Sequence, residues 1–166
     1  MKEEITLEIT DYCPNSCRFC SSDATTHKNN ATFMSLEIVK ERLGDERYKH
    51  IIVSGGEPLS HPQFYEIWQE CKKHTNDPIL YSNEITHLIY NPHVIDGVYL
   101  EANITITPET DKIHILRRVK QGREKDRPEV HLSRNFSEDC SCGHRVIKPD
   151  GTITMTPCNK WQKVEE

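Results

Sequence analysis

The sequence predicts an α/β fold: a partial (β/α) barrel of about five parallel strands, open on one side, with a C-terminal β-hairpin extension. Strand-like and helix-like apolar patterns alternate along the chain, which is typical of parallel βα units. The stretch from Val98 to Ile106 is apolar on one face and polar on the other, whereas strands covered by helices on both faces are apolar throughout. The polar face therefore favours a curved sheet around a ligand-filled interior over a flat sheet.

The first βα unit has clear boundaries in the sequence. Residues Ile5 to Thr10 alternate between apolar and polar side chains, which predicts a strand with one apolar face. A polar loop follows and extends to Asn30. Beyond it, Ser35 is a typical N-cap and Gly44 a typical stop, so a helix is predicted between them with its apolar side chains on one face.

The later elements follow from the same two periodicities. Strands are predicted over 50–53, 79–81, 98–106 and 129–132, and helices from near Pro62 through Cys71 and over 111–121. Cys71 lies on the apolar stripe of its helix, so we expect it to be a small buried side chain. Because 166 residues are too few for two full-size domains, we expect a barrel over 1–133 and a hairpin extension over 134–166.

Composition argues against several classes of protein. The 26 acidic residues outnumber the 21 basic ones, and the net charge of −5 argues against binding nucleic acid through phosphate neutralisation. The mean hydropathy is −0.70, and no apolar run is long enough to cross a bilayer. No apolar stretch follows the residues Met1 to Glu4, as it would in a secretory signal. We therefore expect a cytoplasmic protein with neither a membrane nor nucleic acid as partner.

The seven cysteines are the unusual feature of the composition. An odd number cannot pair completely within one chain, and nothing in the sequence indicates an oxidising compartment. Cys71 stands alone, and the other six form two groups, Cys13, Cys17 and Cys20 near the N-terminus and Cys140, Cys142 and Cys158 near the C-terminus. Grouped thiols in a reducing compartment indicate metal or iron–sulfur ligands before they indicate disulfides.

The first group has the spacing C-x3-C-x2-C, on the loop that follows the first strand. The carboxyl ends of parallel strands are where active sites of βα folds gather. Three thiolates on one short loop can ligate three irons of a cubic cluster and leave the fourth iron without a protein ligand. Such an open position is typical of a catalytic centre. The alternative is a zinc site, which needs a fourth ligand, and His27 is the nearest candidate.

A second motif, Ser54-Gly55-Gly56-Glu57-Pro58, follows the second strand directly. Because glycines carry no Cβ, Gly55 and Gly56 allow a ligand to approach the backbone closely. The Glu57 carboxylate can accept a hydrogen bond from an ammonium group. By itself this motif is also compatible with an ordinary strand-to-loop turn.

The two motifs together, in this order, resemble those of the radical S-adenosylmethionine (SAM) superfamily over roughly the first 105 residues. The resemblance implies that Cys13, Cys17 and Cys20 bind a [4Fe-4S] cluster whose free iron chelates the amino and carboxylate groups of SAM. It also implies one-electron reduction by a donor such as flavodoxin or ferredoxin, cleavage of SAM to a 5′-deoxyadenosyl radical, and abstraction of a hydrogen atom from the substrate.

The same resemblance implies contacts to SAM. Phe19 matches the aromatic position near the adenine, and Gly55, Gly56 and Glu57 match the segment that contacts the methionine amino group. Ser82 is a further expected contact, although Glu84 stands where the family often has a glycine. Glu101 lies on the polar face of the fourth strand, where the family often places a ribose or carboxylate contact. A salt-bridged barrel residue is the alternative for Glu101.

The second cysteine group flanks a hairpin turn. Pro149 presets φ and Gly151 accepts a positive φ, so the chain reverses at Asp150 and is expected to bring Cys158 back next to Cys142 and close to Cys140. This pattern resembles the start of the SPASM or twitch extension of radical SAM enzymes, which binds auxiliary iron–sulfur clusters. We expect a single auxiliary cluster whose fourth ligand is Asp139, His144 or substrate, with a zinc hairpin or idle thiols as alternatives.

The expected substrate is a peptide or protein. Five predicted strands are fewer than the six βα units usual in the family, so the barrel should expose a sheet edge that needs a cover. The hairpin, a second subunit or a large substrate could supply it. One alternative is an activase of glycyl-radical enzymes, and another is a non-catalytic zinc or iron–sulfur binding module. The oligomeric state is not predicted.

Overall fold

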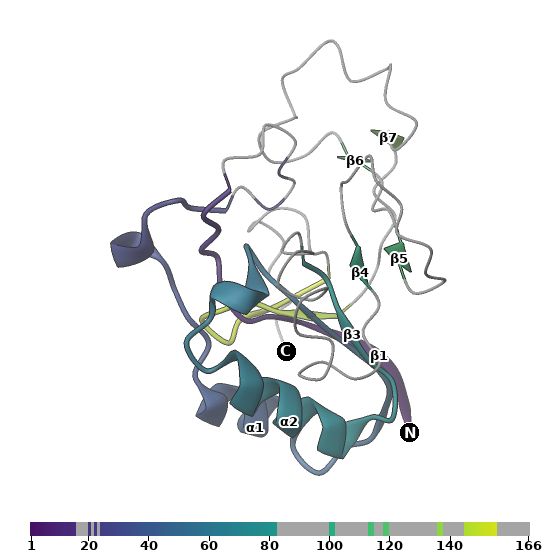
Figure 1. The fold of residues 1–166 in the computed structure, drawn as a ribbon. Helices are drawn as coiled ribbons and strands as arrows, with labels where there is room; N and C mark the ends of the chain where they lie inside the picture. Colours follow the sequence, from purple (N-terminus) through teal and green to yellow (C-terminus); the bar gives the residue numbers. More distant parts are fainter. Residues whose placement is uncertain are drawn as a thin grey trace.

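Figure 1 shows the computed structural model of the 166-residue chain. The structure describes residues 1–15, 20, 22, 24–82 and 145–155, and also the strand segments 100–101, 113–114, 118–119 and 136–137. The statements that follow concern these residues.

The described strands form one main sheet, in the order β5-β4-β3-β2-β1-β8-β9. Its strands are β1 (Lys2–Glu8), β2 (Tyr48–Ser54), β3 (Pro78–Leu80), β4 (Leu100–Glu101), β5 (Ile113–His114), β8 (Val146–Ile147) and β9 (Ile153–Thr154). Neighbouring strands from β5 to β8 are parallel, and β8 and β9 are antiparallel. As described, the sheet does not close, so the predicted α/β fold with an open partial barrel is confirmed.

Two helices, α1 (Leu36–Leu43) and α2 (Phe64–His74), lie side by side against one face of the sheet (Figure 1). The core between them and the sheet contains Ile5, Leu7 and Ile9 of the first strand and its extension. Two short 3-10 helices, η1 (Lys28–Asn30) and η2 (Pro58–Ser60), lie in the loops that follow β1 and β2. The helices therefore cover one face, and the opposite face of β1 carries the polar side chains of the strand.

Local signals in the sequence set the ends of α1 as predicted. The Ser35 hydroxyl accepts a hydrogen bond from the Ile38 N–H (3.3 Å), and Gly44 ends the helix with φ +56°. In α2, Cys71 is fully buried, and burial raises the pKa of its thiol to about 12. The prediction that Cys71 is a small buried side chain is confirmed.

The helix predicted over 111–121 is wrong at the residues that the structure describes. Ile113–His114 form β5, and Arg118–Val119 form β6, which pairs with β7 (Phe136–Ser137) in a separate two-stranded sheet. The β-branched side chains of Ile113 and Val119 favour strands, and pairing with neighbouring strands prevails over a weak helical pattern. The strand predicted over 129–132 lies outside the described residues.

The C-terminal hairpin extends the main sheet at the edge of β1. Strand β8 pairs with β1 in parallel, with Thr6 opposite Val146 and Leu7 opposite Ile147. The turn forms where Pro-Asp-Gly predicts it, since Gly151 has φ +84° and its N–H donates to the Lys148 carbonyl (2.8 Å). Of the three covers considered for an exposed edge, the hairpin is the one that occupies the β1 edge.

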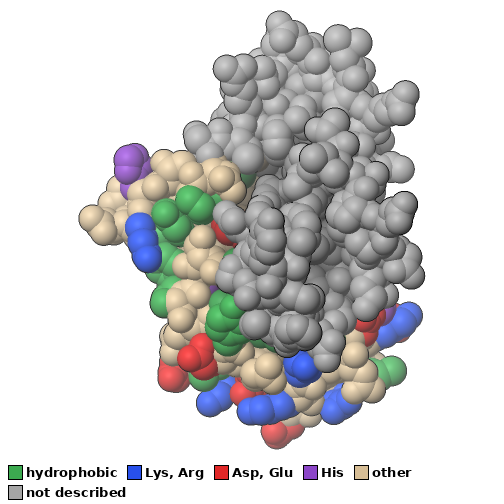
Figure 2. Space-filling model, viewed as in Figure 1, with side chains coloured by type: hydrophobic (Ala, Val, Ile, Leu, Met, Phe, Trp, Pro, Cys, Tyr) green, Lys and Arg blue, Asp and Glu red, His purple; other side chains and the backbone are tan. Residues whose placement is uncertain are grey.

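Charged side chains of both signs are interspersed over the lower part of the molecule, where the helices lie (Figure 2). This face shows no field of a single sign. Among the described residues, no helix combines the length and the apolar character that crossing a membrane requires.

His61 ties the start of α2 to the segment that leaves the cysteine loop. Its Nδ1 accepts from the Gln63 N–H (3.0 Å), so Nε2 carries the proton that is donated to the Met34 carbonyl oxygen (3.0 Å). The side chain is buried, and this burial lowers the pKa of His61 below its usual value. The neutral ring is therefore the form that the fold requires.

We expect acid to destabilise the protein through His61. Because the pKa is lower in the folded chain, the unfolded chain binds the proton first, and stability falls as the pH drops below the ordinary histidine value of about 6.5. One such proton contributes at most about 1.4 kcal/mol per pH unit. Urea unfolding at pH 7.5 and pH 5.5 measures this, with His61→Gln as the variant that keeps a donor but does not titrate. An equal loss in wild type and variant would contradict the role of His61.

Candidate functional site

The loop that carries the first cysteine group begins directly after β1. The Cys13 N–H donates to the Thr25 carbonyl oxygen (2.9 Å), and the Thr25 N–H donates to the Asp11 carbonyl oxygen (2.8 Å). These two bonds form a parallel bridge between Tyr12 and Thr25. The bridge closes the base of the loop and fixes the chain on either side of the cysteines.

Two of the three cysteines of this loop are described. Cys13 is buried, with 7% of its surface exposed, and the Cys20 Sγ accepts a hydrogen bond from the Ala24 N–H (3.4 Å). The Cys20 Sγ also lies 3.5 Å from the Ser22 hydroxyl oxygen. Hydrogen bonds to sulfur are one means by which proteins tune iron–sulfur centres. Cys17 and Phe19 lie outside the described residues.

The donor set suits a thiolate-ligated cluster. Among the side chains that the structure describes, no three of His, Cys, Asp and Glu converge on a metal position, and the motif's Cys17 is not among them. Cys13 and Cys20 are two of the three soft sulfur ligands that the predicted cluster needs, and both belong to one loop whose base is closed by backbone hydrogen bonds.

The two glycines after β2 pack against the backbone that leads into the cysteine loop. The Gly56 N–H donates to the Thr10 carbonyl oxygen and the Glu57 N–H to the Tyr12 carbonyl oxygen, both at 2.7 Å. A Cβ at Gly55 would lie 2.4 Å from the Thr10 oxygen, and one at Gly56 would lie 2.2 Å from the Tyr12 oxygen. The close approach that demands glycine here is thus to the chain's own backbone, a role that the sequence analysis missed.

Glu57 and Ser82, both predicted to contact SAM, are buried and contact each other. The Ser82 hydroxyl donates to Glu57 Oε1 (2.7 Å), which also accepts from the Leu59 N–H (3.1 Å) as the N-cap of η2. Glu57 is 1% exposed. The structure therefore brings the ends of β2 and β3 together through one carboxylate. For Glu101, the structure describes the backbone as part of β4, next to β3.

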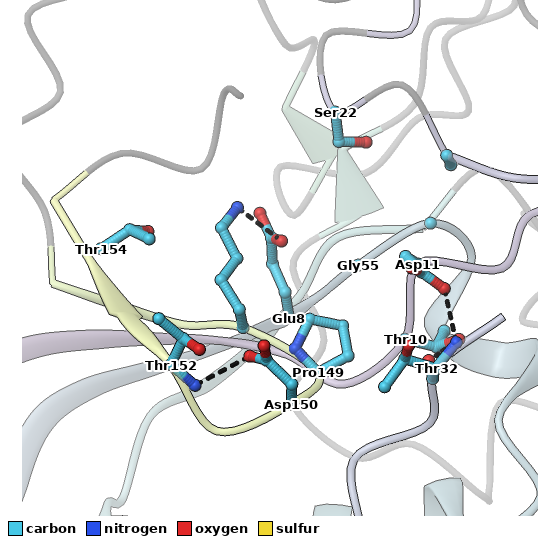
Figure 3. Close-up of a pocket in the computed structure, with 13 residues that line it drawn as sticks. Glu8, Thr10, Asp11, Ser22, Thr32, Gly55, Pro149, Asp150, Thr152 and Thr154 are labelled. Carbon is cyan, nitrogen blue, oxygen red and sulfur yellow. Dashed lines mark hydrogen bonds and ion pairs between the residues drawn. The ribbon is translucent and has the colours of Figure 1, made fainter. Parts of the chain in front are cut away.

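A pocket of about 200 Å³ lies between the end of β1, the glycine pair, the cysteine loop and the C-terminal hairpin (Figure 3). Most of the lining residues have polar side chains, although apolar atoms make up most of the exposed lining surface, and they come from segments far apart in the sequence: Glu8, Thr10, Asp11, Ser22, Ala24, Thr32, Gly55, Gly56, Lys148, Pro149, Asp150, Thr152 and Thr154. Two of these residues, Ser22 and Ala24, belong to the cysteine loop, and both contact the Cys20 sulfur. The pocket thus adjoins the predicted cluster loop on one side and the hairpin on the other.

A buried ion pair lines this pocket. The Lys148 Nζ lies 2.7 Å from Glu8 Oε2, and the two side chains are 10% and 9% exposed. In Figure 3 the carboxylate of Glu8 points into the pocket, and the dashed line that ends on this carboxylate marks the contact. Neither residue stands out in the sequence, because the two lie 140 positions apart and each is an ordinary polar residue at the end of a strand.

One comparison with known proteins identifies a family. The family model described as Radical SAM superfamily matches residues 7–134, which include the end of β1, the cysteine loop and the glycine pair. No curated protein matches the chain.

Proposed function

Because this chain belongs to the radical SAM superfamily, we propose that it is a radical SAM enzyme that modifies a peptide or protein. The family assignment makes the chain an enzyme that uses a [4Fe-4S] cluster, SAM and a reductant. When bound, the cluster and SAM supply a 5′-deoxyadenosyl radical that removes a hydrogen atom from the substrate. The chain's own residues bind and orient these groups and exclude water.

We assign Cys13, Cys17 and Cys20 as the ligands of the cluster. Two observations support this assignment: backbone hydrogen bonds close the base of the loop, and the Ala24 N–H donates a hydrogen bond to the Cys20 sulfur. Phe19 is the proposed neighbour of the adenine.

The proposed SAM contacts include Gly55, Gly56, Glu57, Ser82 and Glu101. The buried carboxylate of Glu57, oriented by the Ser82 hydroxyl, is a suitable acceptor for the methionine ammonium group.

The composition of the pocket walls is the observation that best supports a peptide or protein as the substrate. One wall is the cysteine loop and the other is the hairpin, and the lining between them combines polar side chains with a larger exposed area of apolar atoms, as a peptide itself does. A peptide segment offers the donors and acceptors that such a lining can pair. The β5 edge of the main sheet supports the same proposal, since no described strand covers it and a macromolecule can cover such an edge.

We further propose that the extension over 134–166 holds a second metal site at Cys140, Cys142 and Cys158. In the hairpin, Val146 lies opposite Thr154, and the sequence places Cys142 four residues before the first and Cys158 four residues after the second. Equal spacing on both arms of an antiparallel hairpin supports a common site for the two thiols. Asp139, His144 or the substrate would supply the fourth ligand.

The test compares wild-type protein with the triple variant Cys140→Ala/Cys142→Ala/Cys158→Ala after anaerobic reconstitution. We expect about eight irons per wild-type chain and about four in the variant, as for two cubic clusters and one. With dithionite in place of flavodoxin or ferredoxin, both proteins should release 5′-deoxyadenosine from SAM. Equal iron contents would contradict the second site, and substrate turnover unchanged in the variant would favour a glycyl-radical activase. If the wild-type protein holds zinc, or forms no 5′-deoxyadenosine, the proposed enzymatic function is contradicted and a non-catalytic binding module is favoured.

A further inference from the structure

We propose that His61 is a positioning residue for SAM: it holds the end of η2 against the exit of the cysteine loop and thereby keeps the Glu57 carboxylate in place. This inference rests on the proposed function, in which Glu57 accepts a hydrogen bond from the methionine ammonium group. It adds a residue that lies outside both sequence motifs and acts through Glu57.

The segment from Glu57 to His61, which contains η2, is attached to the chain on both sides of the cysteine loop. At its start, the Glu57 N–H donates to the Tyr12 carbonyl oxygen (2.7 Å) at the entry of the loop. At its end, the His61 Nε2 donates to the Met34 carbonyl oxygen (3.0 Å) at the exit. The exit is itself fixed on the extension of β1, because the Met34 N–H donates to the Ile9 carbonyl oxygen (2.7 Å).

Two partners and a neighbouring ring fix the orientation of the His61 side chain. Its Nδ1 accepts from the Gln63 N–H (3.0 Å), so the proton is on Nε2 and points to Met34. The residue is 4% exposed, and the Phe33 ring packs edge-on against it with the ring centroids 5.4 Å apart. A buried N–H that loses its acceptor is unfavourable, so this attachment resists breaking.

The path from His61 to the Glu57 carboxylate is one turn long. The His61 backbone N–H donates to the Pro58 carbonyl oxygen (3.0 Å) and closes the turn of η2. Within that turn, the Leu59 N–H donates to Glu57 Oε1 (3.1 Å). Hydrogen bonds in a 3-10 turn have poor geometry, so the turn depends on attachments at its ends. Release of the His61 end therefore loosens the Leu59 donor and, with it, the direction of the carboxylate.

The expected effect is a reduced affinity for SAM and not a loss of the cluster. The Ser82 hydroxyl donates to the same Glu57 oxygen (2.7 Å) and does not depend on His61. We therefore expect SAM to bind about tenfold more weakly, which is less than the roughly hundredfold loss that a displacement of about 1 Å can cause. The iron content should be unchanged, because the bridge between Tyr12 and Thr25 closes the base of the loop without His61.

Two substitutions separate the two hydrogen bonds of the ring. In His61→Gln, the side-chain amide reaches the position of Nε2 and can still donate to the Met34 carbonyl oxygen. In His61→Asn, the shorter amide reaches only the position of Nδ1 and can still accept from the Gln63 N–H. Positioning requires the bond that glutamine keeps, so asparagine should impair SAM binding and glutamine should restore it.

Thr75→Val is the matched control, at the opposite end of α2. The Thr75 hydroxyl donates to the Lys49 carbonyl oxygen (2.8 Å) and accepts from the Asp77 N–H (3.1 Å), and the residue is 1% exposed. It therefore repeats the bonding of His61, one distant carbonyl and the N–H two residues on, without a contact to the cysteine loop. This variant should lose stability as His61→Asn does and bind SAM as wild type does.

The measurements use the whole chain after anaerobic reconstitution with iron and sulfide. Iron per chain and the thermal unfolding temperature are determined first, and amide hydrogen exchange of residues 57–61 is followed by mass spectrometry without SAM. The rate of 5′-deoxyadenosine formation with dithionite is then measured against SAM concentration. In His61→Asn we expect exchange at least about tenfold faster in this segment, because local opening becomes easier. The KM for SAM should rise about tenfold with little change in kcat, because a contact that holds SAM equally in the ground and transition states affects KM alone.

Unchanged exchange and KM in His61→Asn would overturn the positioning role. A KM for His61→Gln or Thr75→Val as high as that for His61→Asn would also overturn it, since the effect would then follow general destabilisation. Glu57→Gln separates these failures from that of the proposed function, because it should raise the KM at least as much as His61→Asn. If it leaves the KM unchanged, the role of Glu57 fails together with this inference, whereas wild type that forms no 5′-deoxyadenosine contradicts the enzymatic function.

Discussion

Replacing Cys17 by alanine should abolish the iron centre of the first loop and lower 5′-deoxyadenosine formation at least about a hundredfold. Two thiolates, Cys13 and Cys20, would remain on a loop whose base stays pinned by the Tyr12–Thr25 bridge. They cannot ligate three irons of a cubic cluster, so the cluster is lost even though the fold is kept. Iron and sulfide per chain and the nucleoside released after reduction with dithionite are the measurements.

Cys71→Ala is the matched control, because it removes a thiol that cannot serve as a ligand. The side chain is fully buried in α2, and its pKa of about 12 keeps it protonated. Iron content and nucleoside formation should equal those of wild type, with a stability loss of about 1 kcal/mol for the small cavity. A Cys17→Ala protein that keeps a cluster responsive to SAM would contradict the assignment, as would a control that loses iron.

The sequence was informative wherever the determining interaction is local. The alternation in β1, the cap at Ser35, the stop at Gly44 and the turn at Asp150 each depend on a few neighbouring residues, and the structure shows all of them. The two motifs of the candidate site are of the same kind, since each is a short run that follows a strand. Their match to a family is confirmed, whereas the roles of their individual residues stay predictions.

Interactions between distant segments could not be read from the sequence. The pairing of β8 with β1 and the ion pair between Glu8 and Lys148 join residues about as far apart as this chain allows. The helix expected over 111–121 failed for a related reason, because strand neighbours decide the conformation of Ile113. Periodicity reports which face a side chain occupies but not which strand lies beside it.

Gly56→Ala should destabilise the protein by about 3–5 kcal/mol and lower its thermal unfolding temperature by about 10 °C. The added Cβ would lie 2.2 Å from the Tyr12 carbonyl oxygen, which is backbone and cannot rotate away as a flexible side chain could. Relief requires moving the end of β2 away from the segment that enters the cysteine loop, which breaks the Gly56–Thr10 and Glu57–Tyr12 hydrogen bonds. We therefore expect partial loss of iron as well, measured on the same reconstituted sample.

Gly44→Ala is the control that separates lack of space from backbone conformation. Gly44 has φ +56° and ψ −138° with nothing within 4 Å of an added Cβ, so this substitution carries only a conformational cost of about 1–3 kcal/mol and should leave iron unchanged. The comparison also distinguishes two roles for the glycine pair. If Gly56 serves only the approach of SAM, Gly56→Ala keeps its stability and iron and loses affinity for SAM alone. If it serves the junction between the two motifs, as its contacts indicate, stability and iron fall together before SAM is added.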